Sequence, residues 1–66
     1  MKTIEETIAY LESEIAKHIE TSNIYAQKMR ESIDDEEFTS FDNLRLIHIL
    51  IKLNLEKVLK FLKSDL

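Results

Sequence analysis

The first half of the chain carries an apolar side chain at nearly every third or fourth position. This spacing keeps the apolar groups on one face of an α-helix, which completes a turn about every 3.6 residues. The stripe consists of Ile4, Ile8, Leu11, Ile15, Ile19, Ala26, Met29 and Ile33, with Ser22 at the remaining step. Thr3 and Glu6 have the spacing of a capping box at a helix start. We therefore predict a helix over about 4–32, whose weakest point is the low-propensity run 21–23.

The second half carries a heptad repeat, in which two sets of core positions recur every seven residues. The first set is Phe41, His48, Leu55 and Leu62, and the second is Leu44, Ile51 and Val58. This repeat predicts a second helix over about 35–64. Residues 47–55 also alternate between apolar and mostly polar positions, which fits an intermolecular strand. We favour the helix because the heptad extends beyond this window on both sides.

A turn is expected between the two helices, near residues 33–34. Asp34 and Glu37 have capping-box spacing, and Ile33 and Phe38 stand where a hydrophobic staple would pair them. The four acids at 34–37 suit the positive end of a helix dipole, although an acidic binding patch is the alternative interpretation. A later helix start, capped by residue 39 or 40, is a second alternative. The fold class predicted for 1–66 is all-α, a single antiparallel helical hairpin.

A tight hairpin pairs positions whose numbers sum to about 67. This register places Leu11 opposite Leu55, and Ile15 opposite Ile51. The second helix nevertheless carries more apolar side chains than one neighbour can cover. The surplus residues are Leu46, Ile49, Leu50, Leu53 and Phe61. We therefore expect a twofold homodimer that forms a four-helix bundle, with a different protein on the same face as the alternative.

Composition supports association with another chain. The sequence has 66 residues and contains no Gly, Pro or Cys. Disulfides and Cys-ligated zinc are thus excluded, and a Gly-rich phosphate loop is excluded as well. Domains below about 70–80 residues usually need a disulfide, a bound metal or a second chain to be stable.

Charge is unevenly distributed along the chain. Residues 34–43 carry five acids and no base, whereas residues 44–66 carry five bases and two acids. The candidate anion-binding group is Arg45, Lys52, Lys60 and Lys63. Its targets would be an acidic partner, RNA or a membrane interface, but the first helix presents mostly glutamate outward and disfavours nucleic acid. The sequence offers neither an apolar signal region nor a span of bilayer length, so we expect a cytoplasmic protein.

The two histidines are the main candidates for site chemistry. His18 and His48 fall on core-facing stripes at the same level of the predicted hairpin. We expect a hydrogen-bonded polar layer that makes the fold sensitive to pH, because His titrates near neutrality. Metal binding by these two residues is the alternative. No nucleophile and base are paired in the sequence, so we expect neither an enzyme nor a cofactor.

Three further apolar or aromatic residues lie off the main stripe of the first helix: Tyr10, Ile24 and Tyr25. Such groups are favoured anchors for protein partners, although packing on the dimer mate would also occupy them. The predicted function is a small homodimeric helical protein that binds and modulates another protein. The alternatives are a nucleic-acid-binding regulator and a metal-binding bundle.

Overall fold

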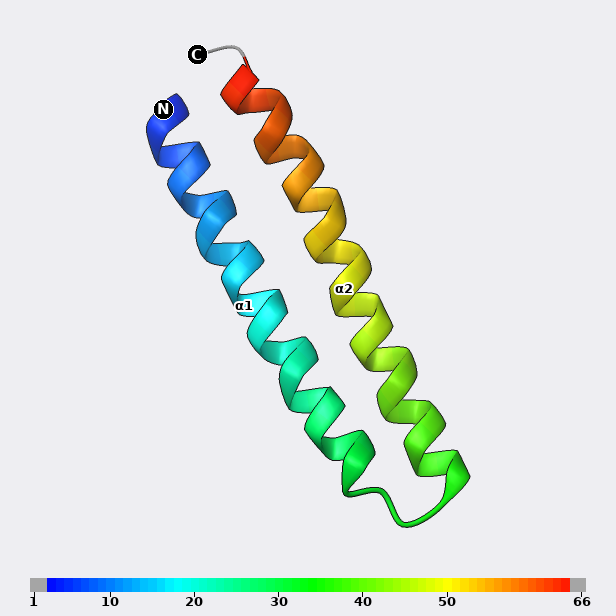
Figure 1. The fold of residues 1–66 in the computed structure, drawn as a ribbon. Coiled ribbons are helices and arrows are strands. Elements are labelled where there is room, and N and C mark those ends of the chain that lie inside the picture. The colour runs from blue at the N-terminus through cyan, green and yellow to red at the C-terminus, as the bar shows by residue number, and fades with distance from the viewer. Residues whose placement is uncertain (1–2, 65–66) are drawn as a thin grey trace.

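Two helices, packed side by side in opposite directions, form the whole described structure (Figure 1). The computed structural model describes residues 3–64, with α1 over Ile4–Arg30 and α2 over Asp35–Ser64. The hairpin is a rod of 48 × 16 × 14 Å. The predicted all-α antiparallel hairpin is therefore confirmed.

Both helices start where capping chemistry predicts. The Thr3 hydroxyl accepts a hydrogen bond from the Glu6 backbone N–H at 3.1 Å, and the Asp34 carboxylate accepts one from Glu37 N–H at 2.7 Å. Each bond satisfies a backbone donor that has no partner within the first helical turn. The alternative start of the second helix at residue 39 or 40 is wrong, and so is the alternative strand over 47–55, which lies inside α2.

α1 ends two residues earlier than predicted, at Arg30. The Glu31 N–H bonds back to the carbonyl oxygens of Gln27 and Lys28 at 3.2 Å, and this closes the last turn. The chain reverses direction immediately afterwards. Ile33 lies in this reversal and is 92% exposed, so the predicted staple between Ile33 and Phe38 is not formed. The spacing was compatible with a staple, but the turn directs Ile33 into solvent.

The low-propensity run 21–23 does not interrupt α1. The Thr21 hydroxyl donates to the Lys17 carbonyl at 2.9 Å, and the Ser22 hydroxyl donates to the Ile19 carbonyl at 2.8 Å. Both hydroxyl groups thus bond to carbonyl oxygens of the preceding helical turn, and the backbone keeps its helical conformation. The helix therefore continues for two more turns.

The hairpin core is very small. Leu11, at 8% exposure, is the one buried residue between 3 and 64. Several positions predicted to lie in the core remain substantially open to solvent, namely Ile4, Ile19, Leu44 and Val58. Two helices in contact along a single line cover only a narrow strip of each other. Most of the apolar surface of this chain is therefore left uncovered by the hairpin itself.

The cap of α2 provides a test of the local stability of the turn. Asp34→Ala removes the acceptor for the Glu37 N–H and is expected to lower the free energy of unfolding by about 0.5–2 kcal/mol. Urea denaturation followed by circular dichroism measures this loss. Asp35→Ala is the matched control, because it removes one negative charge from the same turn but no capping bond. Equal losses in the two variants would contradict a capping role for Asp34.

Candidate interaction surface

The outer side of α2 carries the apolar residues that the sequence predicts as an interface. Leu50 is 60% exposed and Phe61 is 69% exposed, while Leu46 and Leu53 are also exposed and Ile49 is half-buried. Leu50 follows His48 by two residues, which is about 200° around a helix. Because His48 contacts α1, Leu50 points to the opposite side. We call Leu46, Ile49, Leu50, Leu53 and Phe61 the outer surface of α2.

Sequence reasoning missed part of this exposed region. Leu44 and Val58 were assigned to the hairpin core, and Ile47 was not assigned to an interface. All three are exposed in the hairpin, Ile47 to 50%. The heptad could have indicated this exposure, because its apolar residues span a wider arc of the helix than one neighbouring helix can cover. The exposed apolar region thus extends around α2 beyond the outer surface.

The two histidines meet across the hairpin, as their common level predicts. The Nδ1 atoms of His18 and His48 lie 2.8 Å apart, and the ring centroids are 5.1 Å apart. In this hydrogen bond, one Nδ1 atom carries the hydrogen and acts as the donor, and the other Nδ1 atom is the acceptor. The pair forms a part-buried, hydrogen-bonded polar contact between α1 and α2. This hydrogen bond replaces the hydrogen bonds to water that the two ring nitrogens lose between the helices.

Tyr25, which the sequence places off the main stripe of the first helix, contacts the second helix. Its ring stacks on Phe41 at 6.1 Å and on His48 at 5.8 Å between centroids. Tyr25 follows His18 by seven residues, or about two helical turns, and therefore shares its face of α1. The ammonium group of Lys28 lies 5.7 Å from the centroid of the Phe41 ring. Tyr25 is therefore part of an aromatic layer that joins the two helices.

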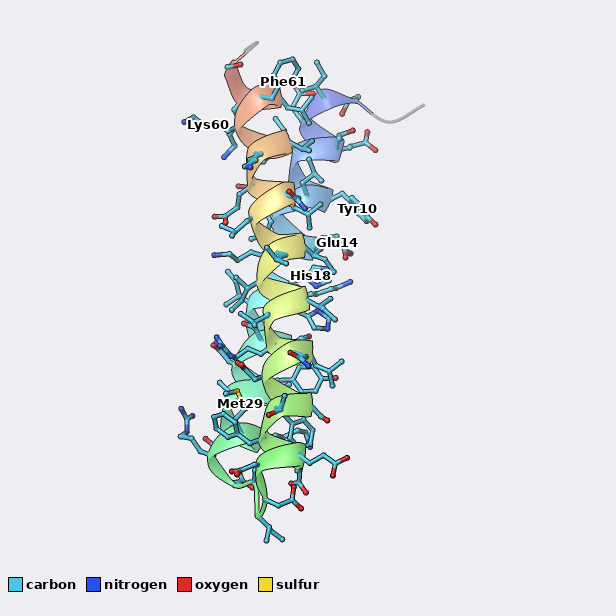
Figure 2. All side chains as sticks on the ribbon, turned by 90° about the vertical axis from the view of Figure 1, so that its right-hand side faces the viewer. Tyr10, Glu14, His18, Met29, Lys60 and Phe61 are labelled. Atoms are coloured by element: carbon cyan, nitrogen blue, oxygen red, sulfur yellow. The ribbon has the colours of Figure 1, made fainter. Side chains whose placement is uncertain are left out.

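Tyr10 and Ile24, the other two candidate anchors, are exposed on α1. They are fourteen residues apart, which is about four helical turns, so they lie along the same side of the helix. In Figure 2, Tyr10 and Lys60 project from opposite edges of the hairpin. The α1 anchors and the outer surface of α2 lie on different helices.

The candidate anion-binding group is largely neutralised within the chain. Arg45 lies 2.7 Å from Asp42, Lys52 lies 3.3 Å from Glu56, and Lys63 lies 3.4 Å from Glu12. Of the four predicted residues, Lys60 alone makes no ion pair with another residue between 3 and 64. Carboxylates beside these cations weaken their attraction for phosphate. The geometry therefore disfavours the nucleic-acid alternative.

The histidine pair has no third metal ligand beside it among the described residues. Residues 3–64 contain no group of three or more His, Asp or Glu side chains arranged to hold a metal ion. Glu14, one turn before His18, pairs with Lys17 at 3.4 Å. Zinc sites in proteins usually need at least three protein ligands.

We expect zinc to leave the melting temperature of the protein unchanged, because the pair supplies only two nitrogen ligands. Differential scanning calorimetry with and without equimolar zinc measures this. The His48→Ala variant serves as the control. A rise in melting temperature in the native chain that is absent in His48→Ala would establish a metal site.

No cavity or cleft opens between the helices in the described part of the chain. Neither helix combines the length and the hydropathy required to cross a bilayer, as judged over the same residues. Comparisons with protein-family models, curated proteins and solved structures find no match to this chain. The surface of the hairpin itself is therefore the basis for assigning a function.

Proposed function

We propose that this protein is a small non-enzymatic homodimer that binds and modulates another protein. The observation that carries the proposal is the imbalance between core and surface. One residue is buried, while thirteen large apolar side chains in the described chain are exposed. Monomeric soluble proteins rarely leave a contiguous apolar region larger than several hundred Å² in water.

The energy available from covering the outer surface of α2 is large for a chain of this size. Full burial of each large apolar side chain contributes at most about 1.5–3 kcal/mol, and partial exposure in the hairpin reduces this figure. Several such side chains together approach the total stability of a small domain, about 5–15 kcal/mol. A second copy is the simplest source of this burial, because symmetric homodimers are the commonest assemblies.

The α1 anchors support a second binding partner. Tyr10 and Ile24 are exposed and lie on the other helix from the outer surface of α2, so we expect them to remain available to a further protein in a dimer formed through α2. Tyrosine combines a large apolar ring with a hydroxyl, and this suits contact with another protein. Recognition by such residues requires no cleft and no catalytic group, in agreement with the open surface of the hairpin.

Light scattering combined with affinity capture tests the proposal. The native chain should have twice its monomer mass, and a tagged form should capture a protein from extract of its native cells. The double variant Tyr10→Ala/Ile24→Ala should stay dimeric but lose the captured protein. Ser13→Ala/Asn23→Ala, two exposed changes on the same helix, is the matched control and should retain it. A monomeric native chain, or capture unaffected by the anchor variant, would contradict the proposal.

A further inference from the structure

The two ends of α2 carry opposite charges, most of which make no ion pair with another described residue. The helix begins with Asp35, Glu36 and Glu37, and its last turns carry Lys57 and Lys60. None of these five residues makes an ion pair with another described residue. Each helix thus presents an acidic start and a basic end to any molecule that packs along it.

Four of the five residues of the outer surface, all except Phe61, lie within residues 46–53, near the middle of α2. α2 covers Asp35–Ser64, so its midpoint falls at residues 49–50. Leu50, which is 60% exposed, therefore stands at the centre of the helix. A twofold axis through this point would superpose the surface on itself in the antiparallel direction. Residues 36–43 of each helix, which carry Glu36, Glu37 and Asp42, would then lie beside residues 57–64 of the other, which carry Lys57, Lys60 and Lys63.

We propose that a second copy of this chain docks antiparallel on the outer surface of α2, with Leu50 at the twofold axis and opposite charges paired at both ends. This inference rests on the proposed homodimer and specifies its geometry. A parallel arrangement would place acid beside acid and base beside base. It would also align the two helix dipoles in the same direction.

A second copy fits this surface better than an unrelated protein on the grounds of self-complementarity. A twofold interface brings one patch against itself, so each feature must be matched within the same helix. α2 meets this condition with its apolar centre and its opposite ends. Apolar burial then provides the affinity, while the exposed charge pairs, which contribute little to stability, select the orientation.

The geometry specifies which positions meet across the interface. With Leu50 at the axis, facing positions have numbers that sum to about 100, so Asn43 of one copy lies near Lys57 of the other. Two copies of Asn43 would be separated by about 14 residues along the axis, or roughly 21 Å. Because the native chain contains no cysteine, disulfides formed by introduced cysteines report these separations directly.

The test uses the single-cysteine variants Asn43→Cys and Lys57→Cys, carried on full chains of distinguishable mass. Oxidation of the mixture should give the mixed disulfide several-fold in excess of either same-site disulfide. Ser13→Cys, on the exposed side of α1, is the control and should give little product with any chain. Circular dichroism and light scattering of each reduced variant establish that it remains a helical dimer.

The alternative results separate this inference from the proposed homodimer. Predominant same-site disulfides from a dimeric chain would overturn the antiparallel arrangement and leave the homodimer intact. A dimer that gives neither product would show that the two copies meet elsewhere, which also overturns it. Monomeric mass for the native chain would overturn both proposals and indicate that a different protein covers α2.

Discussion

Leu50→Glu is expected to separate the two copies into helical monomers. Leu50 is 60% exposed in the hairpin, so the substitution places no charge inside a single chain. In the proposed dimer it brings two carboxylates together at the twofold axis without a compensating cation. Leaving a charge unpaired at an interface costs about 2–5 kcal/mol, which weakens association by roughly 30-fold to 4,000-fold. Sedimentation equilibrium over a range of concentrations measures this change.

Ser13→Glu is the matched control for Leu50→Glu, because it adds the same charge to an exposed position on α1. It should leave the dissociation constant nearly unchanged. If Leu50→Glu retains both the mass and the melting temperature of the native protein, the outer surface of α2 is not an interface. The exposed apolar arc around Leu44, Ile47 and Val58 would then be the next surface to examine.

Leu11→Ala is expected to cause the largest loss of stability among single truncations on α1. Leu11 is the buried residue of the described chain, and removing most of its side chain leaves a cavity between the helices. Substitutions of buried leucine by alanine lower the free energy of unfolding by about 2–5 kcal/mol. Urea denaturation at one fixed protein concentration measures the loss, since dimerisation makes the apparent stability concentration-dependent.

Ile24→Ala is the control for Leu11→Ala, because it removes a similar aliphatic group from an exposed position on the same helix. Its effect should be much smaller, since little apolar area leaves the protein interior. Comparable losses in the two variants would show that the helices are not held together mainly around Leu11. Both variants should keep their helical content before denaturant is added.

Local chemistry predicted the two helix starts well. The Thr3 and Asp34 caps depend on side chains and backbone groups within three residues of each other, so spacing alone identified them. The end of α1 was less accessible to this reasoning. The chain contains no Gly to mark a helix end, and the position of the reversal decided where the last helical turn stops. Ile33 consequently lies in solvent instead of in a staple.

For the histidine pair, the sequence predicted the level along the hairpin but not the geometry of the contact itself. The shared level of His18 and His48 followed from the hairpin register, whereas the 2.8 Å contact between their Nδ1 atoms depends on the rotation of both helices. The stacking of Tyr25 on His48 was not predicted, because the predicted stripe of α1 did not include this residue. Two ion pairs of the candidate anion-binding group, Arg45–Asp42 and Lys52–Glu56, have helical i,i+3 and i,i+4 spacings that the sequence already contains, whereas the Lys63–Glu12 pair joins the two helices and became apparent only in three dimensions.

The sequence by itself determined the two helices, the turn between them, the faces they present and the surplus of apolar residues on the second helix. These properties follow from periodicity and from contacts between residues close along the chain. Only the tertiary structure decided how much of each face is covered. That fraction depends on the distance and rotation between two whole helices, which no local pattern encodes. The result is a hairpin in which Leu11 is enclosed while most of the apolar stripe stays at least partly open to solvent.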